Sequence, residues 1–239
     1  MSDKVTLWNT ITKDNLKFTP ITSNGDIFNT TLLVNDKALL LETPSLIMKP
    51  TKYKITQYKN DTTIPTAFKY IFDDTEPSSV TLRECIGLID IKGKSVLNVD
   101  PELAKQSTVF EYMPLIRDGV MYDGEDDIEQ ESTNWKFITN KENNITTKIF
   151  INKSNTITEL SQDQKTKVTI FKLLGNSSVK CILAINYVWI NKKKRPQHNK
   201  RTYGISVKIL QMEITPKPLA LRNTGLGGYA FHKTEEIIV

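Results

Sequence analysis

The feature that most constrains the fold is a pair of apolar, β-branched runs in the last third of the chain. The runs extend from Val179 to Ile190 and from Tyr203 to Ile214, and a short polar loop separates them. Two such runs around one loop predict a long β-hairpin. The loop carries six positive charges within ten residues, namely Lys192, Lys193, Lys194, Arg195, Lys200 and Arg201. The rest of the chain must therefore be arranged around a hairpin with a basic tip (residues 192–201).

The composition of the basic tip predicts an anionic partner. Like charges this close together repel one another in a solvated loop unless a polyanion gathers them. Trp189 lies just before the tip and Tyr203 just after it, so two flat rings flank the charges. Rings of this kind stack on nucleobases while cations contact phosphates, which favours nucleic acid. The alternative is that the lysine-rich tip is only a solubilising loop.

Strand patterns also prevail over helix patterns elsewhere in the chain. Short alternating segments are separated by turn residues, whereas helices are predicted only from Ser78 or Ser79 to Ile89 and after Asp100. We therefore predict a mainly β fold with minor α content, either an elaborated barrel or a β-sandwich. The expected divisions are an N-terminal arm (1–24), a β-rich nucleic-acid-binding domain (25–215) and an extended C-terminal tail (216–239).

Charge is unevenly distributed along the sequence. Residues 164–212 contain eleven Lys and Arg and no Asp or Glu, whereas residues 118–131 contain seven acids and no base. We expect one strongly positive face or end and one strongly negative loop. The acidic segment 118–132 is predicted to be a mobile loop. Alternatively, this segment mimics nucleic acid and screens the positive face when no ligand is bound.

Basic and aromatic residues alternate at two further places. The segment TKYKITQYK (51–59) has the pattern of a half-buried strand, and NWKF (134–137) adds a tryptophan. Lysines contact phosphates and rings stack on bases of any sequence, although core packing is the alternative for strand aromatics. The predicted nucleic-acid-binding residues are Lys52, Lys54, Tyr58, Lys59, Trp135, Trp189, Lys192, Lys193, Lys194, Arg195, Lys200, Arg201 and Tyr203.

Patterns of catalytic and metal-binding residues are missing from the sequence. His198 and His232 are the only histidines, and neither lies in a nucleophile motif. Cys85 and Cys181 are far apart, which favours buried thiols in a reducing, intracellular compartment over a zinc site. No run has the length of a membrane-spanning helix, and the first residues lack a signal-peptide core. We predict a non-enzymatic protein with no cofactor, no metal and no membrane association.

Four segments resemble one protein family. They are LLVNDKALLLETPSLIMKP (32–50), YMPLIR (112–117), ILAINYVWINKKK (182–194) and KRTYGISVKILQMEI (200–214). Together they look like the single-stranded DNA-binding proteins of nucleocytoplasmic large DNA viruses, the group that includes the African swine fever virus protein. The resemblance covers residues 25–215 and implies a decorated OB-fold-like barrel. Many such proteins end in a strongly acidic stretch, whereas here the tail has only Glu235 and Glu236, which argues against recruitment of partners through the tail.

The residues and the resemblance lead to one hypothesis. The resemblance implies sequence-independent binding of single-stranded DNA during viral DNA replication or repair, with basic residues clamping phosphates and aromatic residues stacking on bases. RNA as the ligand, a homo-oligomer and replication proteins as partners stay open, because contacts to the 2′-hydroxyl have no sequence signature here. The rival hypothesis is a structural or assembly protein of a virion or large complex, whose basic tip meets an acidic partner or the acidic segment of its own chain.

Overall fold

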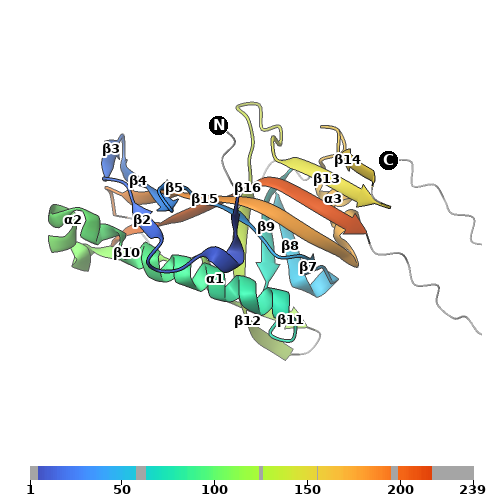
Figure 1. The fold of residues 1–239 in the computed structure, drawn as a ribbon, viewed down its shortest axis with the longest axis horizontal. Helices are drawn as coiled ribbons and strands as arrows, with labels where there is room; N and C mark the ends of the chain where they lie inside the picture. The colour runs from blue at the N-terminus through green and yellow to red at the C-terminus, as the bar shows by residue number, and fades with distance from the viewer. Residues whose placement is uncertain (1–4, 58–62, 124–125, 155, 195–198, 217–239) are drawn as a thin grey trace, which may run out of the picture.

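Strands dominate the computed structural model, which describes residues 5–57, 63–123, 126–154, 156–194 and 199–216 (Figure 1). The α-helices are Pro77–Lys94 (α1), Pro101–Lys105 (α2) and Lys167–Leu174 (α3), and the 3-10 helices are Trp8–Thr10 (η1), Pro50–Lys52 (η2), Val96–Val99 (η3) and Ser107–Val109 (η4). The strands are Thr6–Leu7 (β1), Leu16–Phe18 (β2), Thr22–Asn24 (β3), Ile27–Val34 (β4), Lys37–Ala38 (β5), Leu40–Glu42 (β6), Leu46–Ile47 (β7), Tyr53–Gln57 (β8), Pro65–Ile71 (β9), Phe110–Met113 (β10), Ile116–Asp123 (β11), Asp126–Phe137 (β12), Lys148–Lys153 (β13), Thr156–Glu159 (β14), Ser177–Asn191 (β15) and Arg201–Pro216 (β16).

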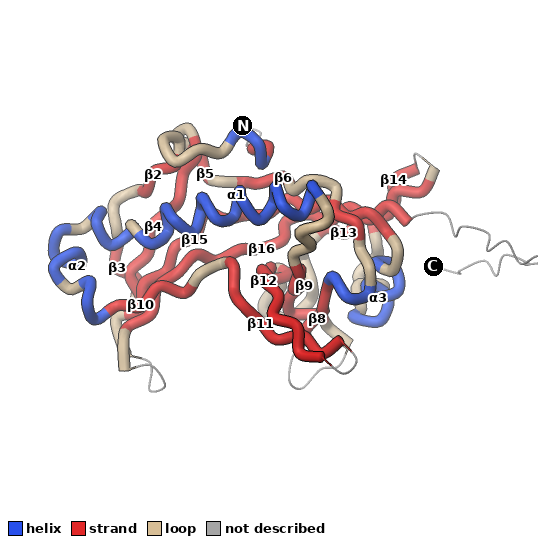
Figure 2. The backbone as a smooth tube through the Cα atoms, turned by 90° about the horizontal axis from the view of Figure 1, so that it is seen from below, coloured by secondary structure: helices blue, strands red, loops and turns tan. Residues whose placement is uncertain are grey.

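The predicted hairpin is the spine of the molecule. Strands β15 and β16 pair in antiparallel fashion from Ser177 opposite Pro216 to Ile190 opposite Tyr203, which confirms the prediction. The other edge of β15 pairs with β4, β6 and β7, and the other edge of β16 pairs in parallel with β10, β12 and β13 (Figure 2). Short strands from most of the chain are thus attached along one long ribbon.

Strands β9 and β8 extend the sheet on the β16 side. Strand β12 pairs with β9, and β9 pairs with β8, so the order across the sheet is β1-β6-β15-β16-β12-β9-β8. The mainly β fold with minor α content is therefore confirmed. The described strands nevertheless form an open mixed sheet instead of a barrel, because the strands at the two ends of this order, β1 and β8, do not pair with each other.

Helix α1 covers one face of this sheet (Figures 1 and 2). Its residues Leu82, Ile86 and Ile89 recur at helical spacing and are fully buried against the strands. The helix is longer at both ends than predicted, because it begins at Pro77 and continues past Ile89 to Lys94. We call the face that packs on α1 the inner face and the opposite face the outer face.

The acidic segment is a correction to the sequence analysis. Residues 118–132 were predicted to form a mobile loop, but most of them belong to the antiparallel pair β11–β12, with Asp118 opposite Glu131. Strand β12 continues into residues that pair with β9, from Ser132 opposite Ile71 to Lys136 opposite Ala67. The pairing of residues 132–136 with β9 fixes one end of β12, from which the pairing with β11 continues through the acidic residues.

Short-range sequence features account for several local elements. Asn35 and Asp36 have φ of 49° and 61° and join β4 to β5 in a tight turn, as a type I′ hairpin requires. Asp100 caps α2, because its side chain accepts hydrogen bonds from the backbone N–H groups of Glu102 and Leu103. Residues 5–24, predicted as an arm, contribute strands that pair with β4 and β6.

Other predictions concern buried thiols and membranes. Cys85 and Cys181 are free and buried, and burial raises the pKa of the Cys85 thiol to about 12. No helix within the described residues is long and apolar enough to cross a bilayer. The predicted C-terminal tail, from residue 217 onward, and both histidines lie outside the described residues.

Candidate nucleic-acid interface

The basic tip makes more internal contacts than its composition suggests. Lys192 Nζ donates hydrogen bonds to Ser23 Oγ at 2.6 Å and to the Gly25 carbonyl at 2.7 Å, and it lies 4.8 Å from the centre of the Phe28 ring. Lys192 therefore anchors the tip to the β3–β4 turn. This lysine is committed to the fold and is a weak candidate for phosphate contact.

The other tip residues differ in how available they are. Lys193 Nζ lies 2.9 Å from Asp26 Oδ1, and this hydrogen bond and charge hold the pKa of Asp26 below its usual range. Both side chains are largely exposed, so a phosphate could replace the carboxylate. Lys194 and Lys200 are exposed, whereas Arg201 packs over the Phe110 ring at 5.6 Å. Arg195 lies outside the described residues.

Two predicted stacking residues are buried, and their assignment was wrong. Trp135 has no exposed surface, and its ring stacks on Tyr70 at 6.0 Å in the core under α1. Tyr203 is 7% exposed and donates a hydrogen bond to the Lys94 carbonyl at the end of α1. Neither residue can present a ring face to a base. Trp189 differs from both because it is half-buried on the outer face.

The predicted binding residues on and around β8 differ in their exposure to solvent. Lys52 Nζ forms an ion pair of 2.7 Å with Asp73 Oδ2, and both side chains are mostly buried at 15% and 10% exposure. The prediction that Lys52 binds nucleic acid was therefore wrong, because its charge is already neutralised within the fold. Lys54 is exposed on the outer face of β8. Tyr58 and Lys59 lie outside the described residues.

Strand pairing brings together a set of cations that the sequence does not group. Lys54 on β8 lies directly opposite Lys69 on β9, and Lys136 on β12 lies directly beside Lys208 on β16. Lys54, Lys136 and Lys208 are exposed and Lys69 is half-buried. Arg117, at the start of β11, is exposed on the same side. We call these five residues the basic face.

No carboxylate lies in the rows of the ladder that carry the basic face. The row through Lys54 and Lys69 continues to Asn134, and the row through Lys136 and Lys208 continues to Ala67 on one side and Ala184 on the other. Paired residues point to the same side of a sheet, so these neighbours share the outer face. The positive charge there is not balanced within its own rows.

Two aromatic residues border the basic face on β15. Trp189 pairs with Gly204 and Tyr187 pairs with Ser206, so the two rings lie on the same side, about 6.6 Å apart along the strand. Tyr187 is 38% exposed. A Cβ on Gly204 would lie 2.9 Å from the Met113 carbonyl and 3.1 Å from Trp189 Cζ2. The absence of a side chain at residue 204 therefore allows the Trp189 ring to lie against the backbone.

A small hollow of about 80 Å³ lies between the Trp189 ring and two residues of the basic face. Its polar lining consists of two cations, Arg117 and Lys136, with the amide of Asn134 and the hydroxyl of Ser206, and Trp189 forms one wall. This set supplies hydrogen-bond donors and positive charge without a carboxylate. The chemistry fits a phosphate group next to a stacked base.

A buried carboxylate holds the connection between β10 and β11, and this positions Arg117 at the start of β11. Asp90 on α1 accepts hydrogen bonds from the Tyr112 hydroxyl at 2.7 Å and from the backbone N–H groups of Leu115 and Ile116 at 2.8 and 3.0 Å. Arg117 Nε then donates to the Pro114 carbonyl at 3.1 Å. Burial and the neighbouring Asp90 charge raise the pKa of Tyr112, so its hydroxyl stays a donor. Helix α1 thus holds the rim of the hollow from the other side of the sheet.

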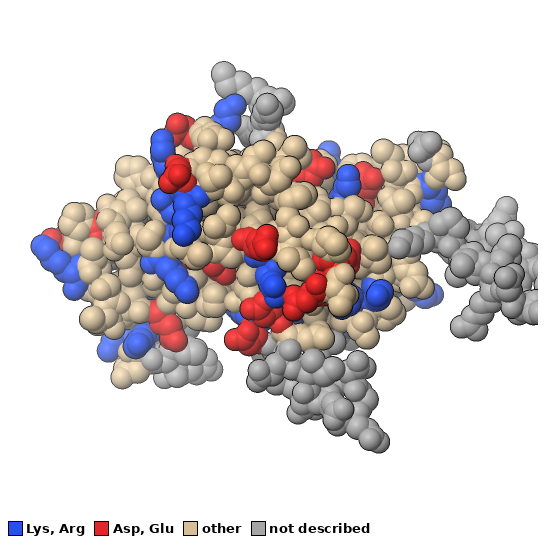
Figure 3. All heavy atoms as spheres, turned by 60° about the horizontal axis from the view of Figure 1, so that its bottom comes forward, with Lys and Arg blue, Asp and Glu red and all other residues tan. Residues whose placement is uncertain are grey.

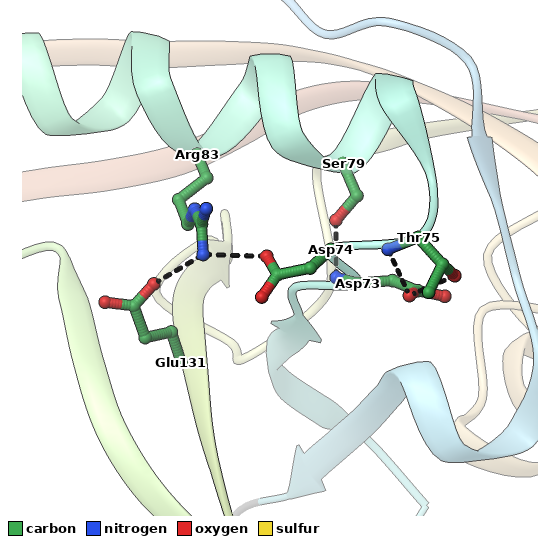
Figure 4. A network of polar contacts seen from close by, with 6 residues as sticks. All are labelled: Asp73, Asp74, Thr75, Ser79, Arg83 and Glu131. Carbon is green, nitrogen blue, oxygen red and sulfur yellow. Dashed lines mark hydrogen bonds and ion pairs between the residues drawn. The ribbon is translucent and has the colours of Figure 1, made fainter.

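Acidic residues gather on the other face, beside α1. Arg83 Nη1 lies 2.7 Å from Asp74 Oδ1 and 3.3 Å from Glu131 Oε2, which ties the start of α1 to β12 (Figure 4). Asp73 and these acids line a hollow of about 450 Å³. Figure 3 shows acidic side chains clustered around basic ones on this side of the molecule. The acids beside α1 are thus paired with Lys52 and Arg83 on their own side of the sheet, away from the rows that carry the basic face.

Sequence reasoning missed most of the basic face. Lys69, Lys136 and Lys208 each stand between apolar neighbours, as ordinary outward residues of amphipathic strands do, and Arg117 is followed by Asp118. The segment NWKF contains Lys136, but only its tryptophan was predicted to bind nucleic acid, and Lys69 lies in a strand with aromatic neighbours on both sides. Only the order of the strands shows that the lysines are neighbours.

Two solved structures illustrate what this chain is similar to. A single-stranded DNA-binding protein from bacteriophage Enc34 is similar with 12% identity and a TM-score of 0.34 as a C-terminal truncation, covering 84% of this chain and 96% of that chain. A second structure of the Enc34 single-stranded DNA-binding protein has 10% identity and a TM-score of 0.33. It covers 87% of this chain and 95% of that chain. No family model and no curated protein matches the chain. The resemblance to proteins of large DNA viruses therefore stays a prediction.

Proposed function

We propose that this protein binds single-stranded DNA across its outer face, without enzymatic chemistry and without a cofactor. The observation that carries the proposal is the pair of like-charged neighbours, Lys54 with Lys69 and Lys136 with Lys208, in rows that hold no carboxylate. Like charges directly opposite one another destabilise a sheet. A sheet that keeps two such pairs side by side is suited to a polyanion that relieves the repulsion.

The aromatic residues make a single strand the better ligand. Trp189 and Tyr187 lie beside the cations on the same face, where unpaired bases can stack on them. In a duplex the base faces are already stacked on one another, so the rings would contribute nothing. Stacking of this kind tolerates any base, which favours binding that depends little on sequence. A role in viral DNA replication or repair, inside the cell, is proposed from the resemblance described above.

The proposal predicts a definite salt dependence. Five phosphates engaged by the five residues of the basic face would lower the logarithm of the affinity with a slope of about −3.5 against the logarithm of salt concentration. The exposed tip residues Lys193, Lys194 and Lys200 lie at the end of the same ribbon and could extend the path. Their contribution is measured by replacing these three lysines with serine and repeating the salt titration.

Tryptophan fluorescence tests the proposal directly. The chain has three tryptophans, of which Trp135 is buried and Trp8 packs against the core, so Trp189 is the reporter. We expect strong quenching when unlabelled dT oligomers are added. A Trp189→Phe variant should lose the quenching while its affinity, measured by anisotropy of a labelled oligomer, falls several-fold.

The controls separate this function from its rivals. A duplex of equal charge should bind more weakly and leave the fluorescence unchanged. Equal binding of duplex and dT without quenching would refute a stacking site and favour an assembly protein with a positive surface. Equal affinity and quenching with the RNA oligomer rU would broaden the ligand from DNA to any single strand.

A further inference from the structure

A second hollow lies on the outer face, farther along the β15–β16 ribbon from the tip. It has a volume of about 170 Å³ and is lined by Glu42, Phe150, Lys180, Cys181, Ile182, Gln211 and Glu213. Ligand pockets for drug-sized molecules typically begin at about 300 Å³. This hollow is therefore suited to one flat ring instead of a larger molecule.

Strand register places the hollow next to the basic face. Ala184 pairs with Lys208, and Ile182, two residues farther along β15, pairs with Gln211 on one side and Glu42 on the other. The next row joins Lys180 to Glu213 and Glu213 to Phe150. From Trp189 to Ile182 the ribbon covers about 23 Å at the usual rise per residue. One extended strand of nucleic acid can therefore reach both hollows.

An irregularity in the ribbon accounts for the hollow. The register of β15 and β16 shifts between Ile182 and Leu183, where β16 has one residue more than β15. A bulge of this kind bends the strand and re-aims the side chains beside it. The bend lies where β6, β13, β15 and β16 meet, so four strands supply side chains to one concavity.

The polar lining differs from that of the hollow beside Trp189, because it holds two carboxylates, Glu42 and Glu213, against one cation, Lys180. Glu213 Oε1 accepts a hydrogen bond from Asn152 Nδ2 at 3.0 Å, which orients this carboxylate. Within the described residues the Glu42 carboxylate has no hydrogen-bond or ion-pair partner, although it is half-buried. Two carboxylates would repel a phosphate. They are acceptors suited to a ligand that donates hydrogen bonds.

We propose that this hollow receives one nucleobase and prefers a base with an exocyclic amino group, cytosine above thymine. The inference rests on the proposed function, because only a strand bound along the outer face brings a base to this position. Carboxylates accept hydrogen bonds from the cytosine N4 amino group, whereas thymine presents its O4 acceptor at the same place and is repelled. Phe150 supplies a ring, and Gln211 can both donate and accept.

The experiment compares dC and dT oligomers of equal length with the full chain at pH 8, where cytosine is unprotonated. We expect dC to bind about fivefold more tightly, which corresponds to the lower end of discrimination by a well-placed hydrogen-bonding pair. A double variant, Glu42→Gln with Glu213→Gln, should reduce the preference to less than twofold, because an amide can turn its NH₂ group toward thymine O4. The matched control is Glu102→Gln on α2, a carboxylate paired with Lys105 outside the hollow, which should keep the full preference.

The outcomes separate this inference from the proposed function. If dC and dT bind equally well to the unmodified protein, with salt dependence and quenching retained, the base pocket is refuted and the binding face stands. A dC preference that persists unchanged in the double variant also refutes the pocket. If neither oligomer binds, the proposed function itself fails. The comparison of dC with dT needs no variant, so it stays decisive even if the double variant does not fold.

Discussion

Replacement of Lys136 by Gln should weaken DNA binding and stabilise the fold at the same time. Lys136 lies beside Lys208 across neighbouring strands and shares a hollow with Arg117, and no carboxylate lies in its row. Two unit charges about 7 Å apart in water repel by about 0.6 kcal/mol, and partial screening leaves about 0.5 kcal/mol. We expect the free energy of unfolding to rise by this amount in low salt.

The same substitution should remove one phosphate contact. The log–log salt slope for a dT oligomer should become less steep by about 0.7, and affinity should fall at low salt. Urea denaturation at about 20 mM and 500 mM salt measures the stability change, which should vanish at high salt because exposed charges are then screened. The matched control is Lys105→Gln on α2, which breaks an exposed ion pair with Glu102. The control should change stability by less than about 0.5 kcal/mol and leave the salt slope unchanged.

Two results would refute the reasoning. A Lys136→Gln variant that is less stable than the parent at low salt would mean that the lysine is neutralised within the fold. An unchanged salt slope would mean that Lys136 contacts no phosphate, and the basic face would lose its central member. The opposite signs of the two expected effects are informative, because a substitution that merely damages the fold lowers both stability and affinity.

Three further predictions concern the support of the site. Lys52 lowers the pKa of Asp73 to about 2, so the ion pair stabilises the folded state above about pH 4. In an acid titration, the free energy of unfolding should fall by about 2 kcal/mol between pH 4 and pH 2. The Asp73→Asn variant should not show this loss. Asp90→Ala should lower the free energy of unfolding by about 3 kcal/mol in urea, because it leaves buried N–H groups without acceptors. Gly204→Ala should displace the Trp189 ring, which would shift its emission and weaken dT binding with little change in salt slope.

The elements that sequence predicted well depend on short-range signals. The β15–β16 hairpin has two long apolar, β-branched runs around one polar loop, the Asn35–Asp36 turn requires residues that tolerate positive φ, and Asp100 precedes a proline at the first helical position. Each signal is complete within a few residues. None depends on which part of the chain packs against it, so the fold had little opportunity to override it.

The length of α1 depended on distant residues. Gly93 lies near its end, and a Cβ there would collide with the Tyr112 hydroxyl and lie 2.9 Å from Ile205 Cδ1. Glycine therefore costs helix propensity at this position but permits close packing on β10 and β16. The local sequence pattern shows only that glycine disfavours a helix and does not show the packing contact that it permits. The predicted helix therefore ends at Ile89, before the residues that make this contact.

The candidate site was predictable only in part, because charge density and strand order are different kinds of information. The basic tip is dense in sequence, yet Lys192 is used to anchor it and Arg201 packs on a ring. The basic face is dispersed in sequence and becomes dense only when β8, β9, β12 and β16 lie side by side. Trp135 and Lys136 illustrate the limit, because adjacent strand residues point to opposite faces and one side chain enters the core while the other reaches solvent.

The same alternation resolves the apparent conflict between an acidic segment and an anion-binding surface. Arg117 and Asp118 are neighbours in β11, but Arg117 pairs with Ser132 and lines the hollow beside Trp189, whereas Asp118 pairs with Glu131, whose carboxylate contacts Arg83 on α1. Had the segment been a loop, its carboxylates could have reached either face. Because it is a strand, Asp118 and Glu131 stand one position from Arg117 and Ser132, and their carboxylates are directed to the opposite face. The net charge of a segment is thus a poor guide to its partner when strand geometry sorts the charges, and the sign of each face must be read from the register.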